Sequence, residues 1–283
     1  MDQEPPFRSL AIVGLGLIGG SLALATRQHW PSVQVTGIDS DAVLAHVRGS
    51  GAIDRSAKQL SEIGKVEVIV LAAPVQENLE LLAQVGKRAL IVTDVGSTKR
   101  AMVEAGREVA LPAVFVGGHP LGGAEHGGFA YARADLFQHR PWIFTPEAST
   151  LPAAVTALTT FVAGIGARPV IMTADEHDRM MAFLSHLPQL TASALMGVVG
   201  DSADAQGLTL AGRGLIDTTR LASSPANVWR DVCQTNADAI GDALDALIGR
   251  LVELRATLRQ PAAIDTLFAD AARWRGVLMK GRE

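Results

Sequence analysis

The chain has 283 residues, 48% of them hydrophobic and 19% charged, enough to bury the cores of about two domains. Its net charge of −4 offers no basic surface for nucleic acid, and its single cysteine, Cys233, excludes an intramolecular disulfide. The acidic, proline-rich N-terminus is unlike a signal peptide. The longest uncharged apolar stretch, residues 10–25, is too short and too glycine-rich to span a membrane. We therefore expect a soluble, cytoplasmic protein.

The first predicted strand and helix enclose a glycine-rich loop. Residues 10–13 are typical of a buried parallel strand, and a helical pattern extends to Arg27. Glycines at this junction permit a tight turn and close approach to a pyrophosphate, and the free amides of the helix favour phosphate. The sequence therefore predicts a dinucleotide site at Gly14, Gly16, Leu17, Ile18 and Gly19.

The second predicted strand, residues 33–38, ends at Asp39. Its distance from the glycine loop is near that of the acid that binds the ribose hydroxyls in such sites. A carboxylate there would repel a 2′-phosphate, so NAD is favoured over NADP. Alternatively, Asp39 caps the helix that begins near Ala42, although Ser40 or Asp41 could also fill that role.

Two further strands, residues 66–71 and 90–93, end at turns on the same predicted sheet edge as the glycine loop, because parallel strands align their carboxyl ends. These turns add Ala72, Ala73, Pro74 and Gly96 to the cofactor site. Ser97 follows Gly96 and could reach the nicotinamide or His119, or it could simply cap the next helix. Lys99 is expected to face solvent.

Residues 117–123 read Gly-Gly-His-Pro-Leu-Gly-Gly and follow a short apolar strand, residues 113–116. We expect a loop here, in which glycines let the backbone approach a ligand and Pro120 stiffens the turn around His119. With a free pKa of about 6.5, a histidine so held can take a proton near neutral pH. The alternative is an ordinary surface histidine.

Strands at 141–145 and 168–172, with a helix at 151–164 between them, complete the first half. The predicted fold class is α/β: a Rossmann-type doubly wound sheet in residues 1–173, then an all-helical domain in residues 174–283.

The helical half begins with acids at 175–176, as the helix dipole prefers, and Pro188 kinks or interrupts its first helix. His177 and His186 lie half a turn out of phase, so they line one pocket only if that helix bends; for each, a structural role is the alternative. Arg220 lies in a glycine-broken segment, and its planar fork suits a carboxylate, although a surface ion pair is also possible.

A helix is predicted over about 226–258, with Trp229 near its start packing against ligand or core. Its leucines recur at a 3-4-3 spacing, which indicates either a core stripe or a subunit seam: Leu244, Leu247, Leu251 and Leu254.

Taken together, these motifs resemble the prephenate and arogenate dehydrogenases of tyrosine biosynthesis. The resemblance runs nearly end to end and is carried by the glycine fingerprint and by Asp94-Val95-Gly96-Ser97-Thr98-Lys99, Gly118-His119-Pro120, His177-Asp178, Ser185-His186-Leu187-Pro188, Thr219-Arg220-Leu221-Ala222 and Trp229-Arg230-Asp231.

By this resemblance His119 is the catalytic base, supported by Ser97, and Arg220 grips the ring carboxylate of the substrate. Glu125, Asp178 and Arg220 form an ionic gate over the site, and the helical half builds a homodimer. His177, His186 and Trp229 are further expected substrate contacts. No residue is assigned to a metal, and any feedback by tyrosine would act at the active site.

Two positions depart from the family pattern. Many prephenate-preferring relatives have a second histidine where this chain has Gln189, and Ala124 stands where Ser or Thr is common. Gln189 should contact the side-chain end of the substrate, and its amide can donate to a keto oxygen or accept from an ammonium group. The choice between prephenate and arogenate therefore stays open.

The implied reaction is NAD-dependent oxidative decarboxylation, in which His119 takes the ring hydroxyl proton, hydride passes to the nicotinamide and the carboxylate leaves as CO2. One alternative is a β-hydroxyacid dehydrogenase, but the corresponding helix offers His177 and Arg179 rather than a catalytic lysine. The other is a non-catalytic NAD-binding sensor, which would not need His119, Ser97 and Arg220 together.

Overall fold

The computed structural model describes residues 4–109, 112–123 and 126–280. Its contacts divide the chain into two compact units, Met1–Ala237 and Asp238–Glu283. The domain boundary that we expected after residue 173 falls inside the first unit, at the N-cap of a helix, and stays a prediction.

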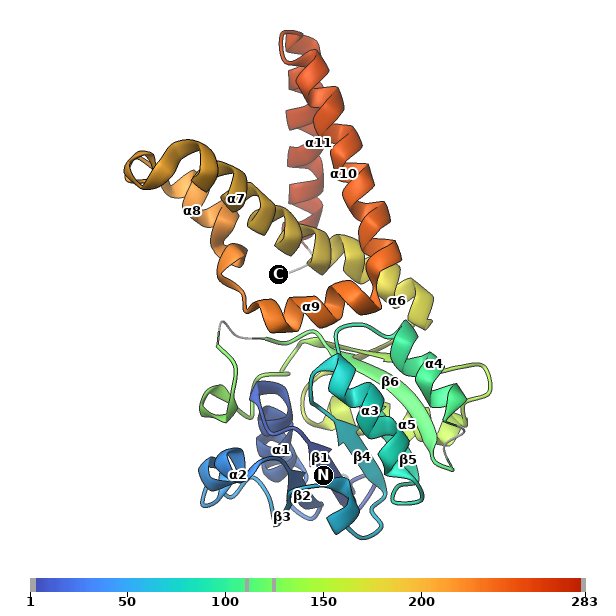
Figure 1. Cartoon of the computed structure of the whole chain (residues 1–283). Coiled ribbons are helices and arrows are strands. Elements are labelled where there is room, and N and C mark those ends of the chain that lie inside the picture. Colours follow the sequence, from blue (N-terminus) through green and yellow to red (C-terminus); the bar gives the residue numbers. More distant parts are fainter. Residues whose placement is uncertain (1–3, 110–111, 124–125, 281–283) are drawn as a thin grey trace. The chain divides into compact units, whose positions relative to one another are not determined.

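The first unit is built on an eight-stranded sheet of order β3-β2-β1-β4-β5-β6-β7-β8, parallel except where β6 pairs with β7. Figure 1 labels strands β1 to β6 of this sheet. This order contains the 3-2-1-4-5-6 sequence of a doubly wound dinucleotide fold, so the predicted fold class is confirmed. The strands are β1 Ser9–Val13, β2 Gln34–Ile38, β3 Arg55–Ala57, β4 Val68–Leu71, β5 Ile91–Asp94, β6 Val114–Pro120, β7 Pro141–Thr145 and β8 Arg168–Ile171.

Alternating residues of the buried strands supply two apolar cores, one on each face of the sheet. In β1, Leu10 and Ile12 enter one core while Ala11 and Val13 enter the other. Helices α1 Leu17–His29, α2 Asp41–Val47 and α5 Pro152–Gly164 cover the first face, and α3 Val75–Val85 and α4 Arg100–Glu108 cover the second.

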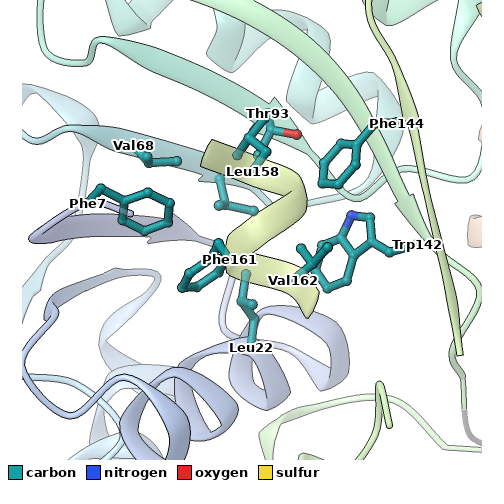
Figure 2. Close-up of a pocket in the computed structure, with 10 residues that line it drawn as sticks. Phe7, Leu22, Val68, Thr93, Trp142, Phe144, Leu158, Phe161 and Val162 are labelled. Carbon is teal, nitrogen blue, oxygen red and sulfur yellow. The ribbon is translucent and has the colours of Figure 1, made fainter. Parts of the chain in front are cut away.

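Figure 2 shows part of the first core, where a small void is lined by side chains of the sheet, α1 and α5. Thr93 carries the only side-chain oxygen among these lining residues, and the rest are apolar or aromatic: Phe7, Leu22, Val68, Val70, Trp142, Phe144, Leu158, Phe161 and Val162. Such a lining belongs to a packed core rather than to a polar substrate site.

The helical part of the first unit begins at Thr173, whose hydroxyl and Glu176 form a capping box for α6 Ala174–Met181. A π-helical turn, η3 Ala182–His186, joins α6 to α7 Leu187–Leu208. Pro188 is the second residue after this turn. Proline has no N–H, and its ring crowds the carbonyl four residues back, so a regular α-helical turn is disfavoured there.

Three shorter elements follow: α8 Arg213–Thr219, the 3-10 turn η4 Arg220–Ser223 and α9 Ala226–Thr235. The single helix that we expected over 226–258 is instead broken at Asn236, whose φ of −136° is not helical. The second unit holds most of α10 Ala237–Thr257 and all of α11 Pro261–Lys280.

By length and composition, the helical run Ala174–Leu208, which is kinked at Asp204, could cross a bilayer. The same run carries His177 and His186, which belong to the site described next.

Candidate active site

The predicted glycine loop has the geometry of a dinucleotide cradle. Gly14 has φ +91° and would press a Cβ to within 2.7 Å of the Ala72 backbone, and a Cβ on Gly19 would lie 1.9 Å from the Gly14 carbonyl oxygen. These two glycines close the turn, whereas Gly16 has open space around its Cβ position. Helix α1 starts there with no side-chain cap, which leaves its first amides available to phosphate.

Asp39 lies beside this loop. Its carboxylate accepts hydrogen bonds from the Leu15 and Ser40 amides, both at 2.7 Å. The N-cap of α2 is Ser40, so capping does not account for Asp39. The turns at Ala72–Pro74 and Gly96 follow β4 and β5 at the same carboxyl edge. These residues suit a nucleotide with free ribose hydroxyls.

His119 lies on a strand rather than in the loop that we expected. Strand β6 continues through Pro120, and its second half pairs with β7, with His119 opposite Ile143. The two preceding residues are glycines because the neighbouring protein atoms leave no room for a side chain, not because a ligand comes close. A Cβ on Gly117 would lie 2.4 Å from Thr145 Oγ1, and one on Gly118 would lie 2.4 Å from the Asp94 carbonyl oxygen. A paired strand holds an imidazole more firmly than a loop does.

The expectation that Lys99 faces solvent is wrong. Lys99 and Asp94 are fully buried and form an ion pair. Asp94 also accepts hydrogen bonds from the Gly96 amide at 2.8 Å and the Gly118 amide at 3.0 Å. The pair thus ties the β5 turn to the strand that carries His119. The local sequence pattern did not predict the burial of Lys99, because the charge is neutralised by Asp94, which tertiary packing brings to it.

A chain of three side chains leads from the sheet into α6. His119 Nδ1 lies 2.8 Å from His177 Nε2, and His177 Nδ1 lies 2.7 Å from Asp178 Oδ1. Asp178 also accepts the Lys99 and Arg100 amides, at 2.7 and 2.9 Å. Burial would raise the pKa of Asp178, but hydrogen bonds from His177, Arg100 and Lys99 lower it, so the carboxylate is ionised.

The ionised carboxylate sets the hydrogen positions along this chain. Because Asp178 can only accept, His177 Nδ1 carries a hydrogen and neutral His177 accepts at Nε2. His119 Nδ1 must then donate to His177, which leaves the lone pair on His119 Nε2. Burial, together with the nearby cation of Lys99, holds the pKa of His119 well below its usual value. His119 is therefore a neutral base. Its acceptor atom, Nε2, is the ring nitrogen that does not bond to His177.

His186 joins the same cluster because η3 is π-helical. A π turn holds more residues than an α turn, so it alters the half-turn separation of His177 and His186 that a regular helix would impose. His186 is buried; its Nδ1 lies 3.3 Å from Asn236 Nδ2, its ring meets Trp229 edge-on, and its Nε2 has no partner among the described residues. Burial lowers the pKa of His186 to about 4.

Three other predicted site residues, Gln189, Ser97 and Arg220, have surroundings in the structure that do not assign them a role. Gln189 is buried, but its amide is already bonded within the protein, to the Leu221 carbonyl at 2.6 Å and the Ser224 hydroxyl at 3.0 Å. Ser97 is half-buried and does not cap α4, whose N-cap is Lys99. Arg220 is exposed at the start of η4, and its guanidinium bonds to none of the described side chains.

Asp178, one of the three residues of the expected ionic gate, is buried and its carboxylate accepts hydrogen bonds from His177, Lys99 and Arg100; the gate itself stays a prediction. Glu125 and Ala124 lie outside the described residues. Sequence reasoning also missed Asn236 and Arg100. Asn236 is buried between Arg100, Asp178 and His186, but one asparagine in a helical pattern carries no signal of this.

A doubly wound sheet with a glycine-rich loop before its first helix, and a half-buried, neutral histidine base on a strand of the same sheet, is the site of a nucleotide-dependent dehydrogenase. Comparison with known families agrees. Residues 22–171 match the prephenate dehydrogenase nucleotide-binding domain, and residues 173–269 match the prephenate dehydrogenase dimerization domain. The chain belongs to the prephenate dehydrogenase family. The glycine loop precedes the first matched range, so its assignment rests on its own geometry.

Individual relatives agree with this membership. The prephenate dehydrogenase of Bacillus subtilis is 35% identical over 270 residues, which cover 92% of this chain and 72% of the relative. The cyclohexadienyl dehydrogenase of Zymomonas mobilis is 31% identical over 89% of each chain. A solved prephenate dehydrogenase from A. aeolicus, in complex with hydroxyphenyl propionate and NAD+, superposes with a TM-score of 0.89 over 95% of this chain and 98% of that one. At 24% identity, this likeness shows the fold.

Proposed function

We propose that this chain catalyses the NAD-dependent oxidative decarboxylation of prephenate, of arogenate or of both. One observation carries the proposal: the Asp178–His177–His119 chain leaves a neutral acceptor, His119 Nε2, at the sheet edge that also bears the glycine loop.

The cofactor residues proposed are those of the cradle and of the turns beside it. Gly16 leaves room for a pyrophosphate, the first amides of α1 face it, and Asp39 stands beside the loop where ribose hydroxyls would bind. A carboxylate at that position opposes a 2′-phosphate, which favours NAD over NADP. Bound there, NAD supplies the hydride acceptor.

His119 Nε2 accepts the proton of the ring hydroxyl as hydride leaves the same carbon. The positive charge that develops on His119 is shared with His177 and stabilised by ionised Asp178. Loss of CO2 makes the ring aromatic, and the proton returns from His119 to the phenol oxygen. Ser97, which is half-buried on the turn after β5, is proposed to support His119.

Substrate recognition is assigned to the helical side. Arg220 is exposed and could grip a carboxylate, and His186 Nε2 is a buried polar atom that has no partner among the residues the structure describes. Trp229 packs against His186, and His177 and Glu125 complete the proposed set. Gln189 is also proposed to contact the substrate. Because its amide bonds to Leu221 and Ser224, we propose that it holds the segment next to Arg220 in place as well.

We further propose a homodimer formed through the helical domain, residues 174–283, and a cytoplasmic location. The match to a dimerization domain supports the dimer. The apolar run Ala174–Leu208 holds His177 and His186 in a polar cluster, which supports a water-surrounded domain rather than a membrane span.

The test is to mix purified protein with NAD and either prephenate or arogenate and to follow the absorbance of reduced nicotinamide. Turnover with one or both substrates supports the proposal and decides the substrate preference. If NAD binds, as measured by calorimetry, but neither substrate is oxidised, the chain is a nucleotide-binding protein with another role.

A further inference from the structure

We infer that Asn236 is a positioning residue that holds His186 in the tautomer with hydrogen on Nε2, so that His186 offers the substrate a neutral hydrogen-bond donor. Asn236 stands at the break between α9 and α10 and is 1% exposed. The inference rests on the proposed function only in taking the substrate as the acceptor.

The orientation of the Asn236 amide is decided by Arg100. Arg100 Nη2 lies 2.7 Å from Asn236 Oδ1, and a guanidinium can only donate, so the atom facing it must be the amide oxygen. The Asn236 nitrogen then faces the opposite way. There it donates to the Asp178 carbonyl oxygen at 2.8 Å, a contact that an amide oxygen in its place could not make. Two independent neighbours thus agree on the same orientation.

With the Asn236 nitrogen fixed, His186 has one consistent hydrogen arrangement. Asn236 Nδ2 lies 3.3 Å from His186 Nδ1 and donates to it, so Nδ1 is the acceptor and the single hydrogen of a neutral imidazole is on Nε2. If the hydrogen were on Nδ1 instead, it would point at the N–H of Asn236, and the two donors would repel each other.

His186 Nε2–H is then a buried donor with no acceptor among the described residues. Leaving a buried donor unpaired is unfavourable, so such a group indicates where a ligand oxygen binds. The side chain is 1% exposed and meets Trp229 edge-on, with ring centroids 6.0 Å apart, so the imidazole cannot turn freely to find water. A carboxylate or keto oxygen of the substrate suits this donor, whereas an ammonium group does not.

The hydrogen positions can be measured directly. In 15N-histidine-labelled full-length protein, nuclear magnetic resonance distinguishes a protonated ring nitrogen from one with a free lone pair, and loss of a signal in His186→Gln assigns the residue. We expect hydrogen on Nε2 and a lone pair on Nδ1 in the wild-type protein at neutral pH. Hydrogen on Nδ1 would overturn the inference. The tautomer itself is read from the wild-type spectrum, and the variant serves only to assign the signal.

Two substitutions test the role of Asn236. Asn236→Asp places a carboxylate beside His186 Nδ1, so hydrogen should move to or be added at that atom. Asn236→Ala removes the donor, so both tautomers should appear. In each we expect the KM of the substrate to rise roughly three- to tenfold, the worth of about one hydrogen bond, with a smaller change in kcat. The matched control is Asn227→Asp, an exposed position on the preceding helix α9, which should keep the wild-type spectrum and KM.

An unchanged His186 spectrum in both Asn236 variants would contradict the inference, even if their stability fell. Failure of the proposed function gives a different result: the predicted wild-type tautomer would be seen, but neither substrate would be oxidised.

Discussion

His119 acts as a base because of what surrounds it rather than because it is a histidine. An unperturbed imidazole is partly protonated near pH 6.5, and a protonated ring cannot accept a proton. Burial and the nearby Lys99 cation disfavour the charged form of His119, and His177 fixes which of its nitrogens carries the lone pair. Lys99 and His177 both belong to elements other than the strand that carries His119.

The pH dependence of turnover follows from this environment. Only neutral His119 accepts a proton, so kcat/KM should fall as pH drops through its lowered pKa, at a pH below the ordinary value of about 6.5. His119→Asn should lose roughly 10²–10⁴ in turnover while still binding NAD. His139→Asn is the control, because His139 is exposed with φ +61°, which asparagine tolerates. Near-normal turnover of His119→Asn would remove this residue from the mechanism.

Arg220 tests substrate binding separately from proton transfer. Arg220→Ala should cost about 1.5–3 kcal/mol, as expected for a hydrogen bond to a charged group, and should appear mainly as a higher KM for the substrate. Arg213→Ala removes another exposed arginine of the same segment and should leave KM unchanged. A wild-type KM in Arg220→Ala would show that another residue holds the ring carboxylate.

At the scale of elements, two irregularities build the site. Strand β6 pairs parallel with β5 and then antiparallel with β7, which brings His119 over the buried Asp94–Lys99 pair. The π turn η3 then lets His177 and His186 share one cluster. Neither feature is the regular structure that its sequence pattern predicts, and functional sites often contain such departures.

Gly118 tests the first of these irregularities. A Cβ at this position would meet the Asp94 carbonyl oxygen at 2.4 Å, and a backbone atom in a sheet cannot move aside easily. Gly118→Ala should therefore lower the free energy of unfolding by about 1–3 kcal/mol and reduce kcat by shifting His119. Urea unfolding and steady-state kinetics measure the two effects. Gly64→Ala, which has open space, should change neither; equal behaviour of the two variants would contradict this account.

At the scale of the whole molecule, the helices that follow the sheet expose many large apolar side chains. In the second unit these include Ile248, Leu251, Val252, Phe268 and Trp274, each more than half exposed. Exposed apolar surface of this extent is typical of a protein interface. Of the four leucines whose spacing indicated a core stripe or a subunit seam, Leu251 is 52% exposed and the other three are half-buried.

The oligomeric state tests this surface. Wild-type protein should behave as a dimer in light scattering coupled to gel filtration, and Leu251→Glu should weaken that dimer by placing a charge in an apolar interface. The control is Arg250→Glu, which introduces glutamate at the neighbouring exposed position and should weaken the dimer much less. A dimer unaffected by Leu251→Glu would place the interface elsewhere.

Much of this protein was predictable from local patterns. The alternating or continuous apolar runs gave the strands β1, β5, β7 and β8 nearly at their observed bounds, and the glycine loop with Asp39 predicted the nucleotide cradle. The spaced motifs around His119, His177 and His186 predicted the family. Such features are local because strand period, helix period and turn chemistry depend on neighbouring residues.

Tertiary structure alone decided the states of the groups in the site. Lys99 is buried because Asp94 neutralises it, Asp178 orients His177, and Asn236 reaches His186 across 50 residues of chain. Whether a charge is buried and which imidazole nitrogen holds hydrogen depend on partners brought together by folding. Those partners are distant in sequence, so no local pattern contains them.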